Sequence, residues 1–250
     1  MRRWSISKTD IGKKRPHNED SYYADDGLGL YVVADGVGGH AKGEVASQEA
    51  VEQIHGFVKA ESAGIAEYLA KPDDEGLAAL RRLLEAAVQS ACYMVYGMAE
   101  QDPEQKGMST TISTLLLAGE VGIIGQVGDS RVYRLRGGMI QQLTEDHTLL
   151  NYKVKHGLLT PEQAARAPGK HVITRAVGHK DYVEVDTIHV DAAPGDRFLL
   201  CSDGLHGYLR DEEIGVIMGV EPKAAVTQLV QLANDRGGRD NITVVLVLVS

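Results

Sequence analysis

Cysteine is almost absent from this sequence. The two cysteines, Cys92 and Cys201, lie far apart, and neither belongs to a Cys-x-x-Cys pair. Disulfide frameworks and structural zinc sites need several cysteines at short, regular spacings. We therefore exclude both kinds of site and expect each thiol to be a small core residue.

Basic side chains are also in short supply. The chain has 26 Lys plus Arg against 35 Asp plus Glu, so its formal net charge is -9. Nucleic-acid binders concentrate basic side chains, because contacts to phosphates release counterions and so add affinity. The acidic balance therefore argues against DNA or RNA as a partner.

Long apolar segments and linkers are missing as well. The longest apolar runs, such as 115–118 and 244–249, are far shorter than the roughly 20 residues that span a bilayer. No apolar segment follows Arg2 and Arg3, as a secretory signal would require. No Pro/Gly/Ser-rich or single-charge stretch divides the chain. We expect one domain over residues 1–250, no membrane contact and a cytoplasmic location.

The remaining pattern predicts helices outside antiparallel sheets. Apolar residues recur at helical spacing over 46–58, 77–98 and 222–233. Strand-like runs are joined mostly by short turns, as at 26–27, 118–120 and 137–138, which favours hairpins and an α+β fold. Residues 149–172 lack a clear period and are expected to form an irregular surface flap. The predicted strands are 28–34, 111–117, 121–127, 131–135, 183–190, 197–201 and 242–249.

Aspartates recur where apolar strands end. Asp35 and Asp203 each follow such a strand and precede glycine, and Asp129 follows a third strand after Gly128. One Asp-Gly pair is usually an ordinary turn, and we assign 26–27 to that class. Asp35 and Asp203 do not lead straight into a partner strand. Two further acidic stretches, 18–20 and 239–241, precede strands.

Carboxylates gathered at one edge of the sheets would need cations. Four or five such groups cannot stay ionised together without positive charge. Hard oxygen ligands, in the absence of a Cys or His pattern, select Mg²⁺ or Mn²⁺ over Zn²⁺. Two such ions activate water and clamp phosphoryl oxygens. The aspartates therefore predict a two-metal site for phosphate-ester hydrolysis.

These residues resemble those of the PPM or PP2C-type metal-dependent protein Ser/Thr phosphatases, especially compact bacterial members. The resemblance implies a four-layer sandwich, with two antiparallel sheets packed face to face, helices on both outer faces and metals at one end. The blocks that carry it are Arg15-Pro-His-Asn-Glu-Asp20, Val33-Ala-Asp-Gly-Val-Gly-Gly-His40, Met108-Ser-Thr-Thr111, Val127-Gly-Asp-Ser-Arg131, Leu143-Thr-Glu-Asp-His-Thr148, Ile173-Thr-Arg-Ala-Val-Gly178, Leu200-Cys-Ser-Asp-Gly204 and Gly238-Arg-Asp-Asn-Ile-Thr243.

The resemblance also implies two tightly bound metal ions, Mn²⁺ or Mg²⁺. Asp35 matches the carboxylate that bridges both ions, and the backbone carbonyl of Gly36 matches a ligand of the second. Asp203 and Asp240 match the other ligands of the first ion. Arg15 matches the arginine that holds the substrate phosphate, which suits its planar fork of donors. We expect Arg15, Asp35 and Asp203 to carry catalysis.

Three more acidic residues complete the predicted metal site. Glu19 matches a position that contacts the second ion through water, and Asp20 is expected beside it at the same distance from the ions. Asp129 matches a ligand of a third, weaker ion seen in bacterial members, with Asp20 and Asp203 nearby.

The sequence departs from the family pattern in places. Val37 stands where animal members carry histidine as a proposed general acid, so protonation of the leaving group is unassigned. His40, three residues on, is interpreted as a helix-entry residue, and Ser109 replaces a usual glycine. His147 could orient the flap or merely cap it.

Two other functions fit parts of the sequence. The stretch 36–41 fits the Gly-x-Gly-x-x-Gly/Ala pattern of dinucleotide binding, but helix and loop, not a second parallel strand, are expected about 20 residues later. A catalytically silent metal- or phosphopeptide-binding regulator of the same fold stays open, although every acidic position is filled. We predict a monomeric phosphatase that hydrolyses phosphoserine and phosphothreonine in proteins, with a bacterial Ser/Thr kinase and its substrates as partners.

Overall fold

The computed structural model describes residues 1–37, 42–169 and 171–250. His40 and most of the glycine-rich stretch 36–41 lie outside the described residues, so their predicted roles stay predictions. Within the described ranges, every helix is too short or too polar to cross a bilayer.

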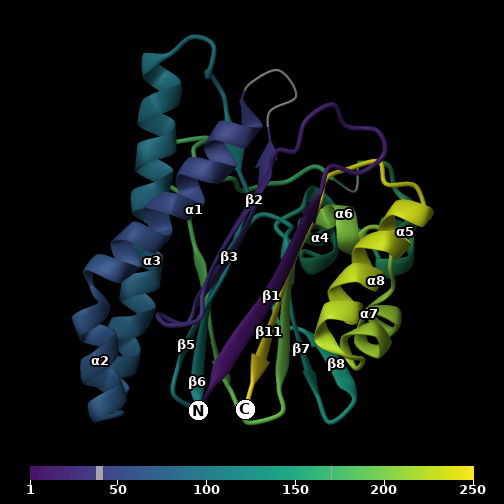
Figure 1. Ribbon diagram of the computed structural model, residues 1–250. Coiled ribbons are helices and arrows are strands. Elements are labelled where there is room, and N and C mark those ends of the chain that lie inside the picture. Colours follow the sequence, from purple (N-terminus) through teal and green to yellow (C-terminus); the bar gives the residue numbers. More distant parts are fainter. Residues whose placement is uncertain (38–41, 170) are drawn as a thin grey trace.

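Two antiparallel sheets form the centre of the molecule (Figure 1). In the first, the order is β1 (Arg3–Asp10), β11 (Ile242–Val249), β10 (Arg197–Cys201), β7 (Arg131–Arg136) and β8 (Met139–Gln142). In the second, it is β2 (Asp20–Asp25), β3 (Leu30–Val37), β5 (Ile112–Ala118), β6 (Val121–Val127) and β9 (Asp186–Asp191), with β4 (Ser109–Thr110) paired to the end of β3. The predicted antiparallel pairing is confirmed.

Helices cover both outer faces. The helices α1 (Gly43–Ala60), α2 (Ser62–Ala70) and α3 (Asp74–Gln101) lie along one side, and α7 (Asp211–Met218) and α8 (Pro222–Asp235) along the other (Figure 1). The short α6 (Asp203–His206) follows β10 directly. The predicted four-layer α+β sandwich is therefore confirmed.

Strand alternation explains why three apolar layers form. In β3, Tyr31 and Val33 face the other sheet, whereas Leu30 and Val32 pack under the α1 and α3 layer. In β11 the same alternation sends neighbouring valines and leucines either between the sheets or toward α8. Successive side chains of a strand point to opposite faces, so a strand buried on both faces is apolar throughout.

The sequence explains where α3 and α8 begin. The side chain of Asp73 accepts a hydrogen bond from the Gly76 amide at 2.8 Å and so caps α3. One face of α3 is buried against the sheet, including Leu80, Leu84 and Val88. In α8, Pro222 occupies the first turn, as predicted.

The segment 149–172 was predicted to be irregular, and this was wrong in part. It contains α4 (Leu149–Lys155) and α5 (Pro161–Arg166), capped by the hydroxyls of Thr148 and Thr160. Only Leu150 is buried in α4, and no residue is buried in α5. Helices so short and exposed have no apolar stripe, so periodicity could not indicate them.

The first prediction tests the packing between the sheets. Phe198 is fully buried in that layer, so Phe198→Ala should lower the free energy of unfolding by about 3–5 kcal/mol through lost contacts and a residual cavity. Tyr93 on α3 is 69% exposed, and Tyr93→Ala should change stability by less than about 0.5 kcal/mol. Urea unfolding measures both variants, and equal losses would contradict this packing.

Candidate metal centre

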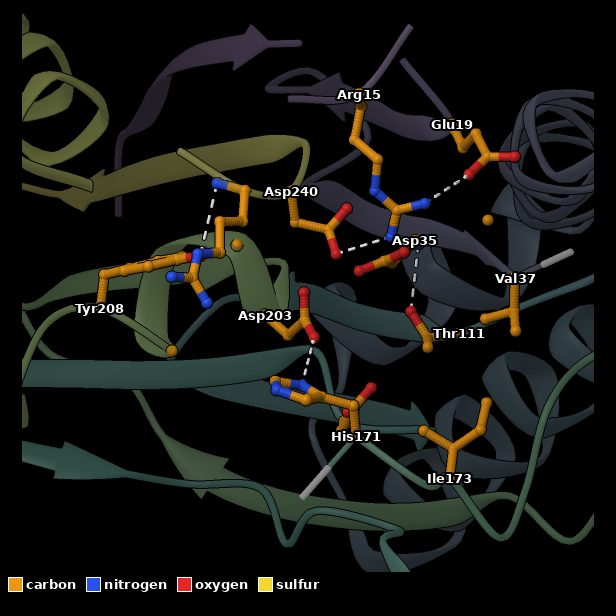
Figure 2. Close-up of a pocket in the computed structure, with 15 residues that line it drawn as sticks. Arg15, Glu19, Asp35, Val37, Thr111, His171, Ile173, Asp203, Tyr208 and Asp240 are labelled. Carbon is orange, nitrogen blue, oxygen red and sulfur yellow. Dashed lines mark hydrogen bonds and ion pairs between the residues drawn. The ribbon is translucent and has the colours of Figure 1, made fainter. Parts of the chain in front are cut away.

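The strand ends place the predicted acidic residues around one pocket of about 550 Å³ (Figure 2). Asp35 is on β3, Asp203 opens α6 after β10, and Asp240 precedes β11. Asp129 and Glu19 also line the pocket. The structure thus brings these five predicted side chains together at one pocket.

Asp20 lies behind the pocket. Asp20 on β2 lies opposite Asp35 on β3 in the antiparallel register, and 8% of its surface is exposed. Its Oδ2 accepts a hydrogen bond from the Ser202 hydroxyl at 2.7 Å. Its Oδ1 is buried and has no hydrogen-bond partner in the described chain. A buried polar atom without a partner is costly, so this oxygen is suited to a cation or to water.

The backbone of Asp35 is fixed by two threonines. The Asp35 amide donates to the Thr111 hydroxyl at 3.0 Å, and the Thr111 amide donates to the Asp35 carbonyl at 2.9 Å. The Thr110 hydroxyl donates to the same carbonyl at 2.9 Å. The carboxylate of Asp35 is therefore carried on a rigid strand end.

Gly36 is required by the close approach of neighbouring backbone. A Cβ added there would lie 2.3 Å from the Gly43 carbonyl oxygen and 2.6 Å from that of Glu19. The Gly36 amide donates to the Glu19 carbonyl at 3.1 Å. Any larger residue would push apart the start of α1 and the segment before β2.

Two cationic or ionisable side chains contact the acidic groups. An Nη atom of Arg15 donates to Asp240 Oδ2 at 2.8 Å, and the other lies 3.6 Å from Glu19 Oε2. His171 Nδ1 lies 3.1 Å from Asp203 Oδ2 (Figure 2). Burial alone would raise the pKa of Asp203, but the His171 hydrogen bond and nearby positive charges hold that pKa below its usual value.

Burial and like charge raise the pKa values of the other aspartates. Burial is the main cause for Asp20, whose pKa rises to about 7, and for Asp129, whose pKa also rises to about 7 with a further contribution from Asp203. The pKa of Asp35 is raised well above its usual value by burial, then by Asp20 and Asp203. The pocket is therefore strongly unfavourable for so many carboxylates without added positive charge.

The donor set fits hard divalent cations. Carboxylate oxygens line the pocket, one carboxylate oxygen is buried without a partner, and no cysteine lines the pocket. Over the described ranges, no three His, Cys, Asp or Glu side chains close around a single point. In this arrangement Arg15 pairs with Glu19 and Asp240, and His171 pairs with Asp203. The residues thus suit Mg²⁺ or Mn²⁺.

Several pocket residues were not predicted. Thr111 stood in a recognised block, yet its hydrogen bond to Asp35 depends on the pairing of distant strands. His171, at the end of the flap, carries no local signal, because its contact with Asp203 spans 32 residues. Tyr208 and Ile173 also line the pocket, and Val37 occupies its rim with 36% exposure.

The second prediction concerns pH and cations. The folded pKa values of Asp20 and Asp129 are raised, so the folded state binds more protons than the unfolded state between about pH 4 and 7. In chelator, the melting temperature should therefore fall as pH rises through this window. Mn²⁺ at about 100 times its dissociation constant should restore roughly 2.7 kcal/mol at pH 7.

Scanning calorimetry across this pH range measures the effect, with Asp20→Asn as a control that removes one titrating group. A melting temperature at pH 7 that is indifferent to Mn²⁺ would contradict the shared cluster.

The comparisons with known proteins agree with this geometry. Residues 12–246 match the family described as protein phosphatase 2C. The serine/threonine protein phosphatase PstP of Mycobacterium tuberculosis is 39% identical over 243 residues, which cover 96% of this chain and 44% of PstP. The chain thus spans less than half of that relative. Protein phosphatase PhpP of Streptococcus pneumoniae is 36% identical over 244 residues, which cover 96% of this chain and 94% of PhpP.

Solved structures of PstP match as well. One covers 100% of both chains at 35% identity with a TM-score of 0.88. Another, of the PstP catalytic domain in complex with 2 manganese ions, covers 99% of both chains at 35% identity with a TM-score of 0.83. On the family match and the near-complete coverage of PhpP, the chain belongs to the protein phosphatase 2C family.

Proposed function

We propose that this chain is an active, metal-dependent protein phosphatase that hydrolyses phosphoserine and phosphothreonine. The observation that carries the proposal is the group of buried or half-buried carboxylates around one pocket, with Arg15 at its side. Relatives that are named serine/threonine phosphatases, such as PstP, support the substrate class.

The acidic residues divide by their place in the pocket. Asp35 would be shared by two ions, and the Gly36 carbonyl, Asp203 and Asp240, which line the same pocket, would be further ligands. Glu19 and Asp20 support this pair, and Asp129 would hold a third, weaker ion. Bound there, Mn²⁺ or Mg²⁺ would lower the pKa of a water molecule and so supply a nucleophile for phosphoester hydrolysis.

Arg15 is placed to bind the phosphoryl group. Its side chain is 40% exposed, so donors remain available to a ligand while one Nη contacts Asp240. Its interactions with Asp240, and with Glu19 and Asp35, raise the pKa of Arg15, although burial lowers it. A planar guanidinium can bind two phosphoryl oxygens at once. Val37 has no proton to give, so the departing alkoxide takes its proton from another group or from solvent.

The third prediction separates an enzyme from a silent regulator of the same fold. Pure protein with Mn²⁺ should hydrolyse an aryl phosphate and a phosphothreonine peptide, and excess chelator should abolish turnover. Full turnover in chelator would contradict the mechanism. Metal binding without any hydrolysis would favour the regulator.

Two variants test, in that assay, which acidic residue holds the tight ions and which holds the weaker one. Asp35→Asn should remove tight Mn²⁺ binding, because it takes charge from the shared ligand, whereas Asp129→Asn should keep the tight ions and lose turnover. Titration calorimetry counts the ions. Wild-type turnover of Asp129→Asn at every Mn²⁺ concentration would show that Asp129 is only a turn residue.

The fourth prediction concerns Arg15→Ala. Loss of a charge-assisted contact to phosphate should lower kcat/KM about 10- to 150-fold, with Mn²⁺ binding nearly unchanged. Arg82, exposed on α3, gives the matched control Arg82→Ala, which should keep wild-type kinetics. Loss of Mn²⁺ binding in folded Arg15→Ala would show that Arg15 only supports the carboxylates.

We propose that the whole chain acts as one phosphatase domain and as a monomer, and that its partners are phosphorylated proteins, including a bacterial Ser/Thr kinase and its substrates. The bacterial relatives support the class of partner. The paucity of cysteine supports the proposed cytoplasmic location.

A further inference from the structure

The turn between β6 and β7 carries Asp129 into the pocket. Gly128, which opens it, has a φ of +99°, and a Cβ there would lie 2.6 Å from the side chain of Thr111. Within the described chain, no other residue donates a hydrogen bond to the Asp129 carboxylate. The backbone of the turn therefore determines where the Asp129 side chain begins.

His147 holds Gly128 from both sides. The Gly128 amide donates to His147 Nδ1 at 3.1 Å, and the His147 amide donates to the Gly128 carbonyl at 2.9 Å. Because Nδ1 accepts, it carries no proton, and the neutral ring has its proton on Nε2. Nε2 lies 3.1 Å from Asp186 Oδ2, which accepts a hydrogen bond from the Nε2 N–H.

The His147 ring is itself fixed by a second layer. Arg175 donates to Asp186 Oδ1 at 2.6 Å, and its guanidinium also lies 3.2 Å from His147 Nε2. The Thr174 amide donates to the His147 carbonyl at 2.8 Å. Burial lowers the pKa of His147, which agrees with the neutral ring that the hydrogen bonds require.

A second histidine holds the next peptide unit. His206, the last residue of α6, donates from Nε2 to the Asp129 carbonyl at 2.9 Å. Gln126 also stabilises this turn. Its side-chain Nε2 donates to the Gly128 carbonyl at 3.1 Å and to the Ser130 carbonyl at 2.7 Å. The turn is thus tied to the flap side by one histidine and to α6 by the other.

We propose that His147 and His206 are positioning residues, which hold the turn at Gly128 and Asp129 so that the Asp129 carboxylate faces the pocket. His147 acts through Nδ1 and His206 through Nε2. The inference rests on the proposed function, because it assigns the two histidines to the weaker ion that Asp129 would hold. The sequence left open whether His147 orients the flap or caps it. In the structure its side chain instead binds the turn that carries Asp129.

The two different ring atoms allow a crossed test. An asparagine side chain places a polar atom near the position of Nδ1, whereas a glutamine reaches that of Nε2. His147→Asn should therefore retain the Gly128 hydrogen bond and His147→Gln should lose it. For His206 the order reverses, with His206→Gln retaining the bond to the Asp129 carbonyl and His206→Asn losing it.

Two readouts are measured on these four variants. In the protein without metal, hydrogen exchange of the Gly128 amide should be about 3- to 10-fold faster in His147→Gln than in the wild type and near wild type in His147→Asn. The Mn²⁺ concentration for half-maximal turnover should rise about 3- to 10-fold in His147→Gln and His206→Asn. Tight Mn²⁺ binding by calorimetry should be unchanged in all four.

The inference is supported if Asn is tolerated better than Gln at position 147 and Gln better than Asn at position 206. Equal effects of Asn and Gln at both histidines would overturn it. Wild-type behaviour of both His147→Gln and His206→Asn, the variants expected to lose the hydrogen bond, would also overturn it. If a losing variant does not fold, ¹⁵N NMR of the wild type still tests it, since a proton on His147 Nδ1 would overturn the assignment. Wild-type turnover of Asp129→Asn would instead overturn the proposed role of Asp129. Hydrogen exchange of the Gly128 amide would still test whether His147 holds the turn.

Discussion

Repulsion among carboxylates at one end of the sandwich is the constraint on which the site depends. Asp20, Asp35 and Asp129 are all buried enough to raise their pKa values, and each is raised further by acidic neighbours. A fold that only needed stability would place apolar or neutral residues there. The arrangement makes sense where a divalent cation supplies the missing charge, and it links folding stability, metal binding and catalysis in one pocket.

The packing of two sheets creates that constraint. Apolar contacts between the inner faces fix β3, β10 and β11 relative to each other, so the residues at their ends have little freedom. Hydrogen bonds then refine each position. Thr111 ties the β3 end to the Asp129 turn, because its hydroxyl accepts from the Asp35 amide and lies 2.8 Å from the Ser130 hydroxyl. The site is thus held by the core and by a polar layer beneath it.

The sequence could predict the features that depend on local pattern. The bounds of β6, β10 and β11 follow from apolar runs, and the placement of the aspartates follows from where those runs end. Features that depend on distant contacts could not be predicted in this way. His171 reaches Asp203 across the pocket, and His206 reaches the Asp129 carbonyl over 77 residues. The helices α4 and α5 were missed because their caps, rather than a buried face, define them.

The most direct test of this account is anomalous X-ray diffraction from crystals of the protein soaked in Mn²⁺. The account predicts strong manganese peaks inside the pocket, with the Asp35 carboxylate in contact with two of them and Asp203 and Asp240 in contact with one. Saturating Mn²⁺ that gave no peak beside Asp35, or peaks only at other acidic surfaces, would contradict it.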